Sequence, residues 1–170
     1  MGREIRRVVP NWEHPKKEHS DQYQPLYDRS FEEACKEWVK GFESWLDGTH
    51  PDFKEYGDKY TYWEWEGEPP DRKYYRPHWA DEDATWYQLY ETVSEGTPVS
   101  PPFETKKELV DYLVENGDFW CQTRIDERPP TREQATRLVE GGWAPSMMMV
   151  QGGPNAGIYN AYESQDLLDE

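Results

Sequence analysis

The segment 62–68 holds the residue types best suited to chemistry on a carbohydrate. It reads YWEWEGE, so that carboxylates lie between indole rings. Glycosidases use two carboxylates at a defined separation. On a strand, however, alternation would put Glu64 and Glu66 on one face and Trp63 and Trp65 on the other. We therefore interpret the segment as a half-buried strand, and we keep a glycan, nucleotide or other small-molecule site in this Trp/Glu cluster as an alternative.

Other catalytic and metal-binding patterns are missing from the sequence. The four histidines have no helical i, i+4 pairing, and no cysteine pair has the spacing of a zinc site. There is no G-x-S-x-G motif, and Gly152-Gly153 lacks the strand–loop–helix context of a phosphate-binding loop. We therefore expect no catalytic residues, no metal and no cofactor, and we expect a protein that acts by binding and is not an enzyme.

The cysteines and the hydropathy point to the interior of a cell. Cys35 and Cys121 are expected to be free, buried thiols in a reducing cytosol. No run of about 18 apolar residues could span a membrane, and no apolar stretch of signal-peptide length follows the basic N-terminus. The sequence therefore predicts a cytoplasmic protein with no membrane partner.

The charge is strongly acidic and unevenly distributed. The chain has 19 basic and 35 acidic residues, a formal net charge of −16. The segment 43–70 has 8 acidic residues against two lysines, and 81–104 has 6 acidic residues and no basic one. Such a charge disfavours direct nucleic-acid binding. Carboxylates spaced like phosphates can instead occupy the basic groove of a nucleic-acid-binding protein, although acidity that serves only solubility is the open alternative.

The predicted partner-binding residues are carboxylates that replace phosphates and exposed aromatic residues that anchor the interface. They are Asp58, Glu64, Glu66, Glu68, Asp81, Glu82 and Asp83, together with Tyr74, Tyr75, Trp79 and Trp86.

Three helices are predicted from their capping signals and apolar periodicity. They begin after Ser30, Thr105 and Thr131, with Glu33, Glu108 and Gln134 in the capping-box positions, and end at Gly48, Gly117 and Gly141-Gly142.

Strands are predicted from apolar and β-branched residues. The candidates are 5–9, 60–65, 147–150 and 158–162, with 151–157 as a hairpin loop, 86–93 as helix or strand, 96–102 as an extended connection and 10–28 as a long loop. The 26 aromatic residues are expected to build a small core. We predict an α+β fold with three helices packed on a small antiparallel sheet and long Pro-rich loops. We expect a single domain over 1–170, with 1–29 largely extended or loop and 164–170 a tail that is a candidate for disorder.

Several sequence segments resemble small acidic accessory proteins encoded by bacteriophages, a group without an assigned function. The matching segments are 3–7 (REIRR), 10–15 (PNWEHP), 23–28 (YQPLYD), 87–91 (YQLYE), 94–101 (SEGTPVSP) and 142–146 (GWAPS). The resemblance implies a phage setting and therefore a bacterial host cytoplasm. By analogy, small acidic phage proteins often inhibit host machinery, and DNA-mimicking anti-CRISPR and anti-restriction proteins are among them.

The sequence therefore predicts a phage-encoded inhibitor. Its partner would be a host protein or nucleoprotein complex with a basic, nucleic-acid-binding surface. Besides the small-molecule or glycan-binding alternative, a virion-associated structural component is a further one.

Overall fold

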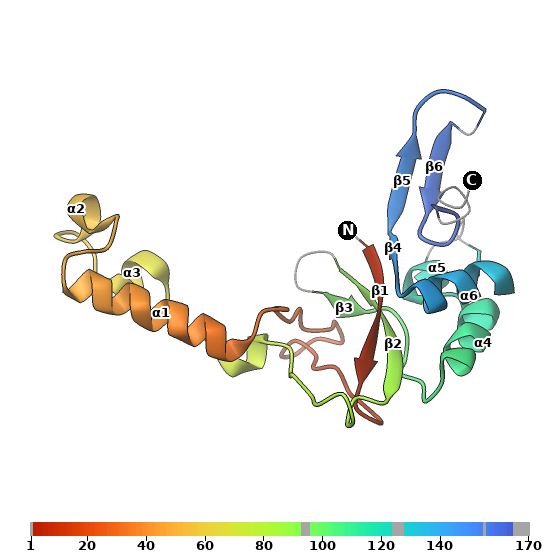
Figure 1. Ribbon diagram of the computed structural model, residues 1–170, viewed down its shortest axis with the longest axis horizontal. Helices are drawn as coiled ribbons and strands as arrows, with labels where there is room; N and C mark the ends of the chain where they lie inside the picture. Colours follow the sequence, from red (N-terminus) through yellow and green to blue (C-terminus); the bar gives the residue numbers. More distant parts are fainter. Residues whose placement is uncertain (1, 93–95, 124–127, 155, 165–170) are drawn as a thin grey trace. The chain divides into compact units, whose positions relative to one another are not determined.

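The chain divides into two compact units. The computed structural model describes residues 2–92, 96–123, 128–154 and 156–164 (Figure 1). Unit 1 comprises Met1–Pro25 and Trp79–Glu170, and unit 2 comprises Leu26–His78. Unit 2 is thus an insertion between two parts of unit 1 that pair with each other, and no Gly- or Ser-rich linker marks its ends in the sequence. That 1–170 form a single domain stays a prediction. The sequence did not predict the boundaries of unit 2 within it.

Unit 1 is built on a four-stranded antiparallel sheet with the strand order β3–β2–β1–β4. Its strands are β1 (Gly2–Val8), β2 (Trp86–Glu91), β3 (Thr97–Pro98) and β4 (Trp143–Pro145). The segment 86–93, which the sequence left open, is a strand through residue 91, and Val93 lies outside the described residues. The central pair sets the register, with Arg3 opposite Glu91 and Ile5 opposite Leu89.

One face of this sheet is covered by helices. Residues that lie opposite each other in an antiparallel pair share a face, so Ile5 and Leu89 point to the same side. Leu89 is fully buried in a cluster with Leu109, Leu113 and Leu138. Leu109 and Leu113 lie on α4 (Lys106–Asn116), and Leu138 lies on α6 (Arg132–Gly141). The short helix α5 (Phe119–Thr123) lies between α4 and α6 in the chain. The helices predicted after Thr105 and Thr131 are confirmed, and each has the expected capping box.

The N-terminal loop covers the other face. His14 is buried, with its Nδ1 3.1 Å from the hydroxyl of Tyr90 and its Nε2 2.7 Å from the carbonyl oxygen of Gln24. The indole of Trp12 donates to the same Tyr90 hydroxyl at 3.1 Å. Burial lowers the pKa of His14 below its ordinary value. The predicted long loop 10–28 is thus present as a mostly exposed segment, whose part in unit 1 is fixed to the sheet by Trp12 and the buried His14.

The predicted C-terminal hairpin is also confirmed. β5 (Met147–Val150) and β6 (Gly157–Asn160) are antiparallel, with Met149 opposite Ile158. β5 continues the direction of β4 and carries the hairpin beyond the sheet (Figure 1). Of the predicted tail 164–170, Ser164 is buried, and residues 165–170 lie outside the described residues.

The regular elements of unit 2 are helices joined by turns and loops, with one isolated bridge between Tyr27 and Tyr75. Its elements are α1 (Phe31–Leu46), α2 (Phe53–Tyr56), α3 (Tyr62–Glu66) and the 3-10 helix η1 (Arg72–Tyr74). The helix predicted after Ser30 is confirmed as α1, with the Ser30 side chain accepting from the amide of Glu33. The fold is thus a mixture of helix and sheet as predicted. The prediction that three helices pack on one sheet is wrong, because α1 belongs to unit 2 and the structure has additional short helices.

The predicted strand 60–65 is wrong. Residues 62–66 form α3, because Thr61 and Glu64 make a capping box that starts a helix. Tyr62, only 4% exposed, then packs among aromatic rings of α1, with centroids 5.3 Å from Trp38 and 5.8 Å from Trp45. The core of unit 2 is therefore aromatic, as the composition suggested, whereas the buried cluster of unit 1 consists mainly of Leu, Val and Ala.

Gly41 makes this packing possible. It lies within α1, and a Cβ at this position would overlap the hydroxyl of Tyr62. Gly41→Ala should destabilise unit 2 by about 1–3 kcal/mol despite the better helix propensity of Ala, because overpacking outweighs it. Thermal unfolding followed by tryptophan fluorescence would measure the change. Adding Tyr62→Phe should recover part of the loss, whereas a Gly41→Ala variant as stable as wild type would contradict this packing.

Candidate functional site

The predicted carboxylates of unit 2 are exposed, and one of them is structural. Asp58, Glu66 and Glu68 have no lysine or arginine within ion-pair distance among the described residues. Glu64 instead accepts from the amide and the hydroxyl of Thr61, both at 2.8 Å. The backbone hydrogen bond lowers the pKa of Glu64, which keeps its carboxylate charged. Because Glu64 caps α3, its removal would perturb the fold as well as the surface.

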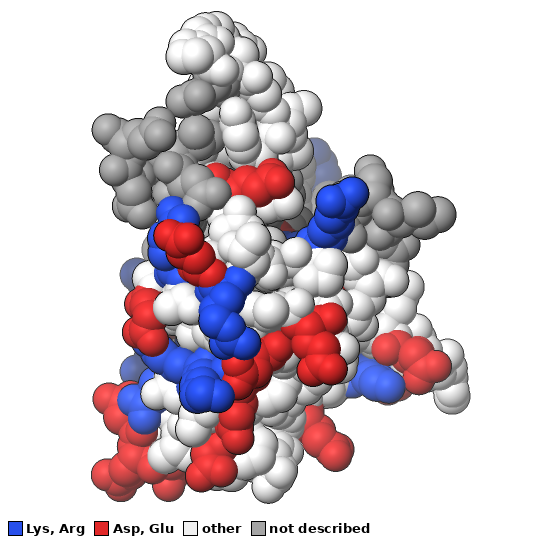
Figure 2. Space-filling view, turned by 90° about the vertical axis from the view of Figure 1, so that its right-hand side faces the viewer, with Lys and Arg blue, Asp and Glu red and all other residues white. Residues whose placement is uncertain are grey.

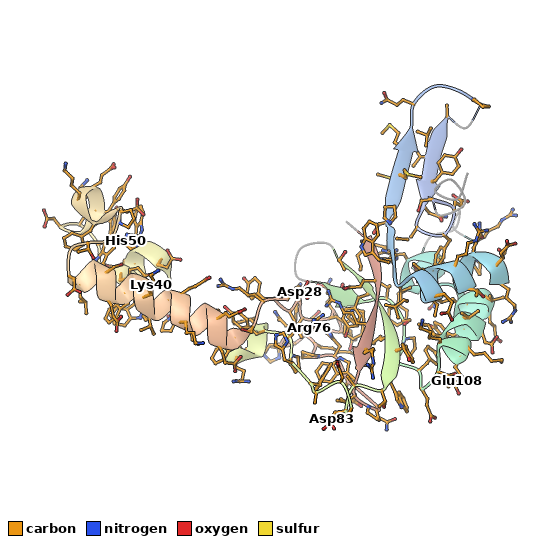
Figure 3. The ribbon with its side chains drawn as sticks, in the orientation of Figure 1. Asp28, Lys40, His50, Arg76, Asp83 and Glu108 are labelled. Atoms are coloured by element: carbon orange, nitrogen blue, oxygen red, sulfur yellow. The ribbon has the colours of Figure 1, made fainter. Side chains whose placement is uncertain are left out.

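Three consecutive carboxylates form a second group in unit 1. Asp81, Glu82 and Asp83, hereafter the turn triad, are all exposed in the turn before β2. Asp83 is labelled in Figure 3. None of the three carboxylates has a basic partner within ion-pair distance in the described part of the chain. The predicted acidic residues are therefore divided between the two units, four in unit 2 and three in unit 1.

The backbone of this turn is held from two sides. The amide of Asp83 donates to the carbonyl oxygen of Ala80 at 3.0 Å. The Arg7 guanidinium, on β1, donates to the carbonyl oxygen of Asp81 at 2.7 Å. Just before the turn, the indole of Trp79 packs edge-on against Trp12, with centroids 4.8 Å apart. The turn triad is thus presented on a fixed backbone, with its side chains free to meet a partner.

The predicted aromatic anchors differ in exposure. Tyr74 is 39% exposed, whereas Tyr75 is only 8% exposed and packs against Tyr27 and Phe31. The expectation that Tyr75 presents its ring on the surface is therefore wrong. Trp79 and Trp86 are half-buried in unit 1. Of these four residues, Tyr74 and the exposed part of Trp79 remain suitable as anchors.

The Trp and Glu residues of segment 62–68 do not alternate between two faces as they would on a strand, because residues 62–66 form a helix. In α3 the side chains of Trp63 and Trp65 lie about 200° apart around the helix axis. Trp65 stacks on Tyr56 with centroids 4.1 Å apart, while Trp63 is 47% exposed and packs on Trp38 and Phe42. The two indoles therefore do not form one stacking platform, and the glycan or small-molecule alternative stays a prediction.

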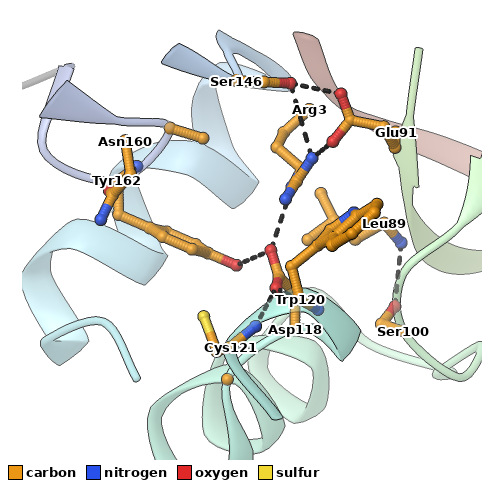
Figure 4. Close-up of polar contacts among 12 residues, drawn as sticks. Arg3, Leu89, Glu91, Ser100, Asp118, Trp120, Cys121, Ser146, Asn160 and Tyr162 are labelled. Carbon is orange, nitrogen blue, oxygen red and sulfur yellow. Dashed lines mark hydrogen bonds and ion pairs between the residues drawn. The ribbon is translucent and has the colours of Figure 1, made fainter. Parts of the chain in front are cut away.

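A buried polar network was not predicted from the sequence (Figure 4). Arg3 on β1 forms ion pairs with Glu91 on β2 and with Asp118, where its Nε donates to Oδ2 at 3.0 Å. Asp118 is 1% exposed, and its oxygens also accept from the Tyr162 hydroxyl at 3.0 Å and from the amides of Trp120 and Cys121 at 2.9 and 3.0 Å. A buried carboxylate is tolerated when its lone pairs are satisfied in this way.

The network also fixes both ends of the β5–β6 hairpin. The hydroxyl of Ser146, directly before β5, donates to Glu91. Tyr162, two residues after β6, donates to Asp118. The only sequence signal for this network is a charged residue at a position of β1 that faces the core, and its partners lie too far along the chain to be identified. It is structural, because its polar atoms are used within the protein.

The structure adds no candidate for catalysis or metal binding among the residues it describes. Cys35 and Cys121 are free and half-buried rather than fully buried. In the same part of the chain, no three His, Cys, Asp or Glu residues are grouped so that they could hold a metal ion. No helix within the described ranges is both long and apolar enough to cross a membrane.

Tyr162 makes unit 1 sensitive to alkaline pH. Burial, followed by the charge of Asp118, raises the pKa of Tyr162 well above its ordinary value of 10.0. Its stabilising effect is therefore complete below about pH 10 and is lost as the pH rises through the folded-state pKa. Tyr162→Phe should cost about 1–2 kcal/mol at neutral pH, because Asp118 loses one donor.

Urea unfolding at about pH 8 and about pH 11 would measure both effects. The difference between wild type and Tyr162→Phe should shrink at the higher pH. Tyr60→Phe, on an exposed ring of unit 2, is the matched control and should change little. A constant difference at both pH values would contradict the role assigned to the Tyr162 hydroxyl.

Comparison with protein-family models, with curated proteins and with solved structures finds no match to this chain. The resemblance to phage accessory proteins therefore stays a prediction, and function has to be argued from the surface of the molecule.

Proposed function

We propose that the protein is an inhibitor that binds a basic, nucleic-acid-binding surface of a bacterial host complex. The turn triad would occupy the positions of phosphate groups. The unit 2 carboxylates Asp58, Glu66 and Glu68 are a separate acidic group, whose share in binding the charge-reversal experiment below measures. The observation that carries the proposal is the turn triad itself. Its three adjacent exposed carboxylates have no lysine or arginine within ion-pair distance among the described residues, and Arg7 holds the backbone of the turn.

The absence of basic partners matters because paired carboxylates have little charge left to offer. On α4 and α6 of unit 1, Asp111 lies 2.7 Å from Lys107 and 2.6 Å from Arg132. Glu140 likewise lies 3.0 Å from Lys106. Basic and acidic side chains alternate on this side of unit 1 (Figure 2). An acidic residue in such a pair is locally neutralised, so the turn triad is a better phosphate substitute than Asp111 or Glu140.

The fixed backbone supports the proposal in a second way. Binding is weakened when a loop must be ordered on contact. The hydrogen bonds of Asp83 and Arg7 already hold the turn, and the half-buried Trp79 lies next to it. A partner with lysines and arginines arranged for phosphates would therefore meet a preorganised acidic surface. Such binding should weaken steeply as salt is added.

A charge-reversal experiment with a matched control tests this proposal. The full chain would be immobilised, bacterial lysate passed over it at increasing salt, and retained proteins identified by mass spectrometry. We expect a nucleic-acid-binding complex that is released by salt and displaced by duplex DNA. Affinity for that complex should then fall roughly tenfold or more in Asp81→Lys/Glu82→Lys/Asp83→Lys, since the attraction becomes repulsion.

The control makes the same change of charge elsewhere in unit 1. Glu18, Glu104 and Glu115 are also exposed and without a basic partner among the described residues. The triple variant Glu18→Lys/Glu104→Lys/Glu115→Lys should keep most of the affinity. Asp58→Lys/Glu66→Lys/Glu68→Lys would measure the share of unit 2 without disturbing the Glu64 cap. Equal losses in the turn-triad variant and in the control would reduce the effect to net charge and contradict the proposal.

A further inference from the structure

The β5–β6 hairpin is the uncharged part of an otherwise highly charged protein. Charged residues make up 32% of the chain, yet residues 141–162 contain no Asp, Glu, Lys, Arg or His. The hairpin lies at the top of Figure 2 and shows neither red nor blue atoms, whereas both occur on the surface below it. The electrostatic binding proposed above therefore cannot use the hairpin.

One face of the hairpin is apolar and open. Met147 and Met149 on β5 are 58% and 60% exposed, and Ile158 on β6 is 67% exposed. Met149 and Ile158 are directly opposite in the register, and Met147 lies two residues from Met149, so the three side chains share a face. We call these three residues the hairpin face. Contiguous exposed apolar side chains on a soluble protein mark a contact surface more often than scattered single ones do.

The hairpin is held firmly at its base. Ser146 and Tyr162, on either side of it, are bonded to the buried Glu91 and Asp118. Ala144 and Ala161 are 1% and 2% exposed within the core cluster of unit 1. A two-stranded ribbon by itself is at most marginally stable in water. Hydrogen bonds to buried carboxylates thus anchor this ribbon, while its apolar face stays exposed to solvent. Such a face is held in place and accessible to a binding partner.

We infer that the hairpin face binds the hairpin face of a second copy of this chain, giving a two-fold symmetric dimer. Two hairpins packed face to face would cover Met147, Met149 and Ile158 of both copies. A two-fold interface uses the same patch on each partner, and an apolar patch without charges is complementary to itself. Methionine side chains are flexible enough to interdigitate across such a contact.

Charge selects a second copy as the occupant. Each chain carries −16, so two copies repel each other wherever their acidic surfaces approach. The hairpin is where two copies can come together without placing carboxylates against carboxylates. Three side chains offer much less than the roughly 800 Å² per partner of a stable standard interface. The dimer should therefore be weak and depend on protein concentration.

Salt separates this inference from the proposed function. Added salt screens the repulsion between two acidic copies, so the dimer should become tighter. Binding of the turn triad to a basic partner should instead become weaker. The two associations use different surfaces of unit 1, and either can fail without the other.

Sedimentation velocity of the full chain tests the dimer over a range of concentrations at low and high salt. The mass should rise from the 20.3 kDa of one chain towards twice that value, at a lower concentration when salt is high. Met149→Gln/Ile158→Thr should shift the transition to at least about tenfold higher concentration, because apolar burial is replaced by polar groups. Val39→Thr/Leu46→Gln makes equivalent changes on exposed α1 residues and should leave the transition unchanged.

Cross-linking keeps the test valid if the double variant is poorly folded, which circular dichroism would reveal. In a Cys35→Ser/Cys121→Ser background, Ile158→Cys should form a disulfide between two chains under mild oxidation. Leu46→Cys should not. A wild-type chain that stays monomeric at every concentration and salt, or equal cross-linking at positions 158 and 46, would overturn the inference.

Discussion

The buried ion pairs of Arg3 are the constraint on which unit 1 depends. One guanidinium on β1 lies between Glu91 on β2 and Asp118 at the start of α5, and all three residues are at least nine-tenths buried. Because a single buried charge left unpaired is costly, the register of β1 with β2 and the position of α5 must be set together. Asp118 and Glu91 also bind Tyr162 and Ser146, so the same charges fix the base of the hairpin.

The charged residues of this small protein differ in how they are paired. Among the described residues, the buried arginines Arg3 and Arg6 form ion pairs, and Asp111 and Glu140 on α4 and α6 are paired with neighbouring lysines and arginines. Within the described part of the chain the turn triad has no basic partner, its backbone is held by Arg7, and the hairpin carries no charge. The proposed functions therefore use the turn triad for a basic partner and the hairpin for a second copy.

Local signals in the sequence predicted the elements that local interactions determine. The Thr105–Glu108 and Thr131–Gln134 capping boxes gave the correct starts of α4 and α6, and the Gly-rich loop gave the β5–β6 hairpin. The prediction of a strand over 60–65 was wrong because it relied on the aromatic residues, although Thr61 and Glu64 have the spacing of a capping box. The exposed acids of the candidate site were predictable from type and position. The burial of Tyr75 and the Arg3–Asp118 pair were not, because they depend on residues far along the chain.

The interpretation of the acidic surface depends on whether the turn triad binds as phosphates do. The decisive quantity is the dissociation constant for the captured host complex as a function of salt, measured for the wild-type chain with and without competing duplex DNA. We predict that affinity falls steeply with added salt and that DNA and this protein exclude each other from the complex. An affinity that is independent of salt, or a complex that binds DNA and this protein together, would contradict it.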